Sequence, residues 1–86
     1  MLAAHLLLAK AYLSSGDVGP AEVEFKEALR LGADREVVVV PLAQIYLMQG
    51  RYQLLIDSIK PDGLSLPAKV DVLSLRGTAL GNVGKS

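Results

Sequence analysis

The most constraining feature of this sequence is a set of residue types that recurs 34 positions further along the chain. The recurring pairs are Leu8 and Leu42, Ala9 and Ala43, Tyr12 and Tyr46, and Gly16 and Gly50. Gly84 follows Gly50 at the same interval, so the opening of a third unit is present. Repeats with a period of roughly 20 to 50 residues build solenoids, propellers or arrays.

The spacing inside the unit indicates which of these architectures applies. The first residues of the unit are three, one and three positions apart, as on one side of an α-helix: His5, Leu8, Ala9 and Tyr12. Gly16 is expected to end this helix in the left-handed conformation, which glycine adopts without steric cost. A second helical spacing follows, in Ala21, Phe25, Ala28 and Leu29. The unit is therefore predicted to be helix, tight turn, helix.

This pattern resembles the tetratricopeptide repeat, whose signature is Trp-x2-Leu-Gly-x2-Tyr, then Ala-x3-Phe, then a proline. The first unit fills those positions with His5, Leu8, Ala9, Tyr12, Ala21, Phe25 and Ala33. The second unit has Val39, Leu42, Ala43, Tyr46, Leu55, Ile59 and Pro67, and the third has Leu73, Arg76, Gly77 and Leu80. The tryptophan is missing throughout, and Leu55 is large for a position that is usually small, so the second hairpin is expected to splay.

The resemblance implies an all-α superhelix, or solenoid, of about two and a half repeats and five helices in one domain. Residues 2–35 would form the first repeat, 36–69 the second with a shortened second helix, and 70–86 the first helix of an incomplete third. Both ends resemble cuts through a longer array, so we interpret the sequence as a piece of one.

Helix signals give the expected boundaries. The first helix is predicted over residues 2–15. The second begins at Asp17, or at Gly19 with Pro20, and runs to about Leu31. The third begins after the N-cap Asp34, the fourth spans Tyr52–Ile59, and the fifth runs from about Pro67 to Val83. The valines at 37–40 favour a strand by propensity, and Pro41 falls inside the predicted third helix. We expect the repeat to prevail, with a kink near Pro41 or a late helix start.

Composition argues against several functions. Nine basic and nine acidic residues cancel without forming a block of either sign, which disfavours nucleic acid as a partner. There is no cysteine, and the longest uncharged run, Val37 to Gly50, is too short to cross a bilayer.

His5, the only histidine, occupies a core position and has no nearby acid in the sequence, so we expect a structural role. The sequence shows no set of a nucleophile, a general base and a residue that orients the base, so we predict no enzymatic activity, no metal and no cofactor.

The segment Ala79–Ser86, ALGNVGKS, satisfies a permissive form of the phosphate-binding loop. A true loop of this kind follows a buried strand and opens a helix. Here the preceding residues are predicted to be helical and Gly84 to be the repeat's turn glycine. Nucleotide binding is therefore only a remote alternative.

Tetratricopeptide arrays bind peptides in a concave groove lined by the first helix of each repeat, and the resemblance implies which residues line it here. The predicted groove residues are Leu6, Lys10, Leu13, Ser14, Val40, Gln44, Leu47, Met48, Ser74, Thr78 and Asn82. Lys10 is the only basic residue among them, which disfavours a clamp for acidic chain termini. An apolar strip containing a methionine suits an amphipathic helix or an extended peptide. Equally, it could pack within a parent protein or against a second copy.

Longer segments resemble one subfamily. AHLLLAKAYLSSGDVGPAEVEFKEAL, LLIDSIKPDGL and VLSLRGTAL are similar to tetratricopeptide lipoproteins of bacterial PEP-CTERM sorting and exopolysaccharide export. That resemblance implies a lipid-anchored parent in the bacterial envelope and a scaffolding role with a protein or peptide partner. The alternative is a purely structural spacer. Self-association through the last helix is also expected, because the helix that should cover it is missing.

Overall fold

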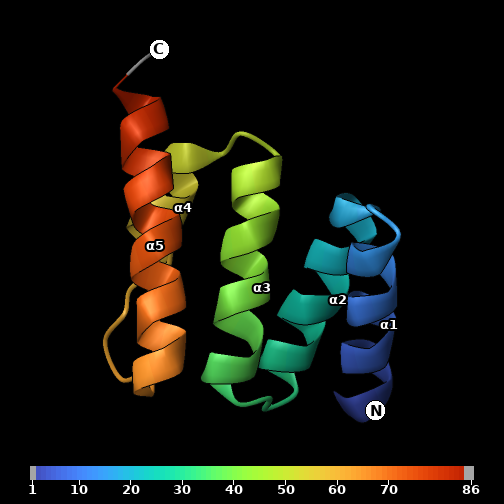
Figure 1. Cartoon of the computed structure of the whole chain (residues 1–86). Helices are drawn as coiled ribbons and strands as arrows, with labels where there is room; N and C mark the ends of the chain where they lie inside the picture. The colour runs from blue at the N-terminus through green and yellow to red at the C-terminus, as the bar shows by residue number, and fades with distance from the viewer. Residues whose placement is uncertain (1, 85–86) are drawn as a thin grey trace.

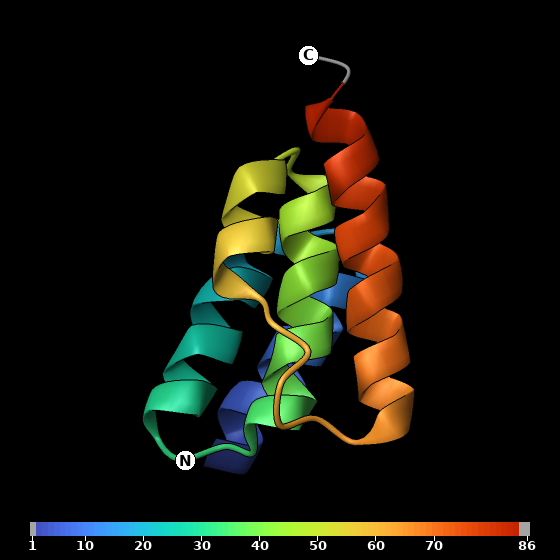
Figure 2. The same ribbon diagram turned by 90° about the vertical axis from the view of Figure 1, so that its left-hand side faces the viewer.

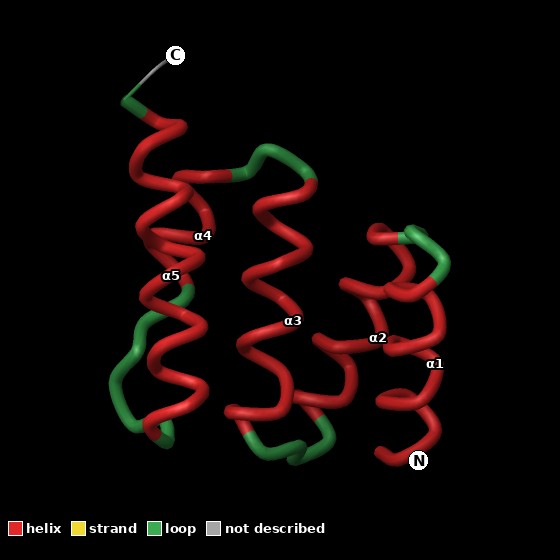
Figure 3. Tube along the Cα trace, in the orientation of Figure 1, coloured by secondary structure: helices red, strands yellow, loops and turns green. Residues whose placement is uncertain are grey.

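A computed structural model describes residues 2–84 as five α-helices joined by short turns and one longer loop. The helices are α1 (Leu2–Ser14), α2 (Val18–Arg30), α3 (Arg35–Met48), α4 (Tyr52–Ser58) and α5 (Leu66–Val83). No strand occurs within residues 2–84 (Figure 3). The predicted all-α class and the five helices are confirmed.

Helices that follow one another in the chain run antiparallel, whereas α3 and α5 run in the same direction (Figure 1). α1 packs along its length on α2, α2 packs on α3, and α3 packs on α5. α4 contacts α5 more extensively than it contacts α3, so the second hairpin is the looser one. Seen from the side, α2 and α4 lie on one side of α3 and α5 lies on the other (Figure 2). α3 is thus the central element of the molecule.

Two turns repeat the same backbone geometry 34 residues apart. Gly16 and Gly50 have φ values of +83° and +73°, in the left-handed region. After each glycine, the next amide donates a hydrogen bond to the carbonyl of a tyrosine: Asp17 N to Tyr12 O at 2.8 Å, and Arg51 N to Tyr46 O at 2.9 Å. This six-to-one bond is the mark of a Schellman motif, which satisfies free carbonyls at a helix end. The predicted bends at Gly16 and Gly50 are confirmed.

The prediction was wrong at Gly84, which is right-handed at φ −69° and ψ −12°. Its amide donates to Leu80 O as in an ordinary last helical turn. The left-handed bend at Gly16 and Gly50 belongs to a hairpin whose second helix follows at once, and α5 is followed by no such helix within residues 2–84. Glycine allows the left-handed bend but does not by itself require it.

The valine-rich segment is helical, as expected from the repeat, but without a late start. α3 begins at Arg35, directly after Asp34, whose Oδ1 accepts a hydrogen bond from Glu36 N at 3.3 Å as the predicted N-cap. Val38 and Val39 are buried. Pro41 lies inside the continuous helix and removes one backbone donor, so Val37 O cannot receive the usual helical bond. Burial of the valines therefore outweighs their strand propensity.

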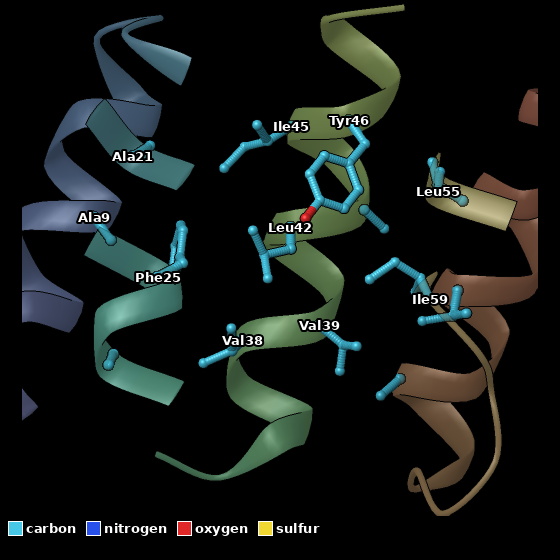
Figure 4. Packing of buried hydrophobic residues seen from close by; sticks show 14 of the residues in the cluster. Ala9, Ala21, Phe25, Val38, Val39, Leu42, Ile45, Tyr46, Leu55 and Ile59 are labelled. Atoms are coloured by element: carbon cyan, nitrogen blue, oxygen red, sulfur yellow. The ribbon is translucent and has the colours of Figure 1, made fainter. Parts of the chain in front are cut away.

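The core extends along α3 and reaches both neighbouring hairpins (Figure 4). The largest fully buried side chains are Phe25, Ile45, Leu55, Val38 and Val72. Ile45 and Val38 point toward Phe25 of α2, while Leu55 lies on the other side of α3 (Figure 4). One continuous core therefore joins the two predicted repeats.

Candidate functional site

The predicted groove residues all lie on solvent-accessible surface. None of them is buried; Leu6, Leu13, Val40, Leu47 and Asn82 are half-buried, and the others are exposed. Met48 is the most accessible of the apolar ones, at 61%. The opposite sides of the same helices supply core residues such as Ala9 and Ala43, both 0% exposed. Leu8, which the spacing placed on the same side of α1 as Ala9, is 45% exposed, so the spacing separated the two faces of α1 only in part.

The structure brings only part of this set together. α3 packs directly on α5, so Val40 and Met48 belong to a helix next to Ser74 and Asn82. α1 packs chiefly on α2, so Leu6 and Leu13 are set further along the row. On α5 the polar side chains bond to their own helix: Thr78 Oγ1 donates to Ser74 O and Asn82 Nδ2 donates to Thr78 O.

A pocket that the sequence did not predict lies on the other side of α3, between α2 and the end of α4. Its volume is about 210 Å³. Its lining is mostly apolar and consists of Lys26, Leu29, Arg35, Val38, Val39, Leu42, Tyr46, Ser58 and Ile59. We call it the α2–α4 pocket. The only sequence signal for it is the early end of α4, because a longer helix would extend past Ser58.

The early end of α4 follows from its sequence, and a side chain of α5 bonds to carbonyl groups at that end. Pro61 disfavours a helical Lys60, and Ile59 is already extended at φ −103° and ψ 108°. The carbonyls of Ile56 and Ile59 both accept hydrogen bonds from Arg76 Nη1. Arg76 stands where the repeat has leucine, so this departure from the pattern satisfies the last turn of the shortened helix.

A bridge of charged side chains covers Tyr46 above the pocket. Glu22 accepts hydrogen bonds from Lys26 at 2.8 Å and from Arg51 at 2.9 Å. Lys26 Nζ lies 5.8 Å, and Arg51 Cζ 5.2 Å, from the centre of the Tyr46 ring, so both cations contact its face. We call this arrangement the Glu22 bridge; it links α2 to the turn between α3 and α4.

The Glu22 bridge shifts the pKa values of Glu22 and Lys26. Partial burial acts to raise the pKa of Glu22, but the hydrogen bonds and charges of Lys26 and Arg51 together outweigh it, so the pKa lies below its ordinary value. The hydrogen bond to Glu22 raises the pKa of Lys26. Both shifts favour the charged forms of Glu22 and Lys26.

Two hydrogen-bonded charges hold the loop that follows α4. Arg35 donates to Asp62 O at 2.8 Å and to Lys60 O at 3.1 Å. Glu36 accepts from Ser65 N at 2.7 Å, and this backbone hydrogen bond lowers the pKa of Glu36. Arg35 thus lines the pocket and fixes the loop beside it.

His5 has an acidic partner, contrary to the expectation from the sequence. Its Nδ1 lies within hydrogen-bond distance of Glu24 Oε1, 19 residues away on α2. His5 is half-buried, so the pair joins the first hairpin and agrees with the structural role proposed for this residue.

The ALGNVGKS segment lies at the end of α5, and Lys85 and Ser86 are outside the described residues. Ala79 to Val83 belong to the helix itself. A phosphate-binding loop opens a helix after a strand, whereas this segment closes one.

α5 also carries an exposed apolar row. Leu66, Val70, Leu73 and Leu80 are 73, 55, 51 and 53% exposed, and Gly77 completes the helical spacing. We call this row the α5 stripe. Leu73, Gly77 and Leu80 occupy repeat positions whose equivalents Val39, Ala43 and Tyr46 are buried in the second unit.

No protein-family model, no curated protein and no solved structure matches this chain. Among residues 2–84, no helix combines the length and hydropathy needed to span a bilayer, and no three potential metal-binding side chains are grouped.

Proposed function

We propose that this domain is a protein-interaction module of tetratricopeptide-like repeats, which binds a peptide or helix on the accessible faces of α1, α3 and α5. One observation carries the proposal: Leu13, Leu47 and Met48 stay accessible to solvent on helices whose other faces are buried. Partly exposed apolar residues in a row are the usual anchors for an amphipathic ligand.

The tetratricopeptide-like assignment is supported by equivalent positions of the two full units. The Schellman turns at Gly16 and Gly50 are the same, and Ala9 and Ala43 are both fully buried. Phe25 and Ile59, also 34 residues apart, are buried at 0% and 4%. By the resemblance stated above, the parent protein would be a lipid-anchored scaffold of the bacterial envelope.

The experiment is a selection of amphipathic helical peptides on the immobilised domain, followed by binding measurements with variants. Leu13→Glu and Met48→Glu are expected to abolish binding of the selected peptides while circular dichroism keeps its helical signal. The matched controls are Leu7→Glu, 72% exposed on α1, and Val23→Glu, 62% exposed on α2, because neither belongs to the predicted groove. Peptides that still bind both groove variants would show that the surface is wrongly assigned.

The competing functions have distinct outcomes. A purely structural spacer would yield no selected peptide. Nucleotide binding requires ATP to raise the melting temperature and Lys85→Ala to remove that effect; an unchanged melting temperature with ATP ends that alternative.

A further inference from the structure

The α2–α4 pocket has the size of a single ring. An apolar cavity of about 150 Å³ in another protein binds benzene. The pocket here measures about 210 Å³ and offers Leu29, Val39 and Ile59 as apolar lining. It therefore has room for one aromatic ring with a short substituent.

The charges around this pocket are unbalanced. Two cations, Lys26 and Arg35, line it, and no acidic residue does. Lys26 shares its only carboxylate, Glu22, with Arg51. No carboxylate of residues 2–84 forms an ion pair with Arg35, whose known partners are two backbone carbonyls. Lys26 and Arg51 therefore share one carboxylate and Arg35 has none, which leaves positive charge at the edge of an apolar pocket.

We propose that the α2–α4 pocket binds a small aromatic carboxylate. The ring would lie among Leu29, Val39 and Ile59, and the carboxylate would accept hydrogen bonds from Arg35 and from the Ser58 hydroxyl, which line the same end of the pocket, while Lys26 adds positive charge at the other end. A ring and one carboxylate account for every kind of group in the lining. The pocket faces away from the predicted groove, so this proposal does not depend on the proposed function.

The test is a titration with phenylacetate followed by the amide resonances of the isotope-labelled domain. Saturable shifts are expected at Val38, Val39 and Ile59. Phenylacetamide, which lacks the charge, is expected to bind about tenfold more weakly, the loss that follows from a charge-assisted hydrogen bond. Equal affinity for the two compounds, or shifts that map to the groove instead, would overturn the proposal.

Variants locate the site without altering the core. Ser58 is exposed, so Ser58→Phe should fill the pocket entrance and abolish the shifts while the fold is retained. Arg35→Gln should weaken binding of phenylacetate more than binding of phenylacetamide, because loss of the loop hydrogen bonds affects both ligands but loss of the charge affects only the carboxylate. Lys10→Gln on α1 should change neither. If Ser58→Phe does not fold, the ratio of phenylacetate affinity to phenylacetamide affinity in Arg35→Gln decides alone, and a ratio equal to that of Lys10→Gln refutes the site.

A last arm tests whether the ligand is instead the end of a polypeptide. The tripeptide Gly-Gly-Phe presents the same ring and a free carboxylate on a peptide backbone. Its binding should be no tighter than that of phenylacetate, because a pocket of about 210 Å³ has room for the ring and a short substituent and none for two further residues. Tighter binding of the tripeptide would contradict the small-molecule assignment.

Discussion

Arg51 Nη1 lies 2.9 Å from Glu22 Oε1, although the two residues are 29 positions apart. Arg51 directly follows the left-handed Gly50, and Glu22 lies on the neighbouring hairpin. The turn that repeats from unit to unit thus also places the side chain that joins the two units. Glu22 is only 13% exposed, so its charge depends on this contact and on Lys26.

Glu22→Gln is expected to lower the free energy of unfolding by about 1 kcal/mol at neutral pH, as for a partly buried hydrogen-bonded ion pair. Glu27→Gln is the control, because its partner Arg30 is on the same helix and the pair is exposed. Urea unfolding measures both. An equal effect of the two substitutions would show that the inter-hairpin contact adds no stability.

Acid should remove the stabilisation that the ionised Glu22 carboxylate provides. The folded pKa of Glu22 is below its ordinary value of 4.5, so its stabilisation is complete above that value and is lost as pH falls through the lowered pKa. Glu36 behaves alike, since its pKa is also lowered. Stability should therefore decline below about pH 4.5, and less steeply in Glu22→Gln. Identical acid profiles of the two proteins would contradict the shift.

Arg76→Leu restores the residue typical of the repeat but should destabilise this protein. It leaves the carbonyls of Ile56 and Ile59 without their donor, a loss of about 1–3 kcal/mol for half-buried groups. Thermal unfolding measures the change, with Lys69→Leu on the same helix as the control. A stabilised Arg76→Leu variant would show that apolar packing matters more than the capping of α4.

Gly50→Ala and Gly84→Ala should differ although the sequence pattern equates them. Alanine at the left-handed Gly50 should cost about 1–2 kcal/mol. Gly84 is right-handed, and a Cβ there meets its nearest neighbour, Leu80 O, at 3.7 Å, so alanine should be neutral or slightly stabilising. Denaturant midpoints of the two variants measure the difference. An equal loss of stability at Gly50 and Gly84 would show that Gly84 is equivalent to Gly16 and Gly50 after all.

Self-association through the α5 stripe is the last prediction. The stripe residues are four, three, four and three positions apart, and Leu73 is the middle one. If the α5 helix of a second copy packs antiparallel on this stripe, Leu66 of one copy lies opposite Leu80 of the other, and Val70 lies opposite Gly77. Light scattering should give a mass that rises with concentration, and Leu73→Glu should abolish the rise, whereas Val23→Glu should not. A constant monomer mass would exclude this contact.

Most of the helix positions could be predicted from local sequence. Gly16 and Gly50 end helices because glycine adopts φ values unfavourable for other residues, and Asp34 begins one because its carboxylate reaches a free amide. The valines of α3 show the limit of local propensity, since their helical state depends on the core that they enter. The groove residues remain a prediction from resemblance and helical spacing.

The sequence by itself determined the helix, turn, helix unit, because this unit depends on spacing and on bonds within a few residues, but it did not determine every core face, since Leu8 and Leu73 stand at repeat positions and are exposed. Only the tertiary structure decided the partners of Arg35, Arg51 and Arg76, the acidic neighbour of His5 and the α2–α4 pocket. These contacts join segments 17 or more residues apart, and long side chains reach such partners only after the helices have packed. Gly84 belongs with this second group, since the repeat predicted a left-handed bend there and its backbone is right-handed, and glycine adopts both conformations.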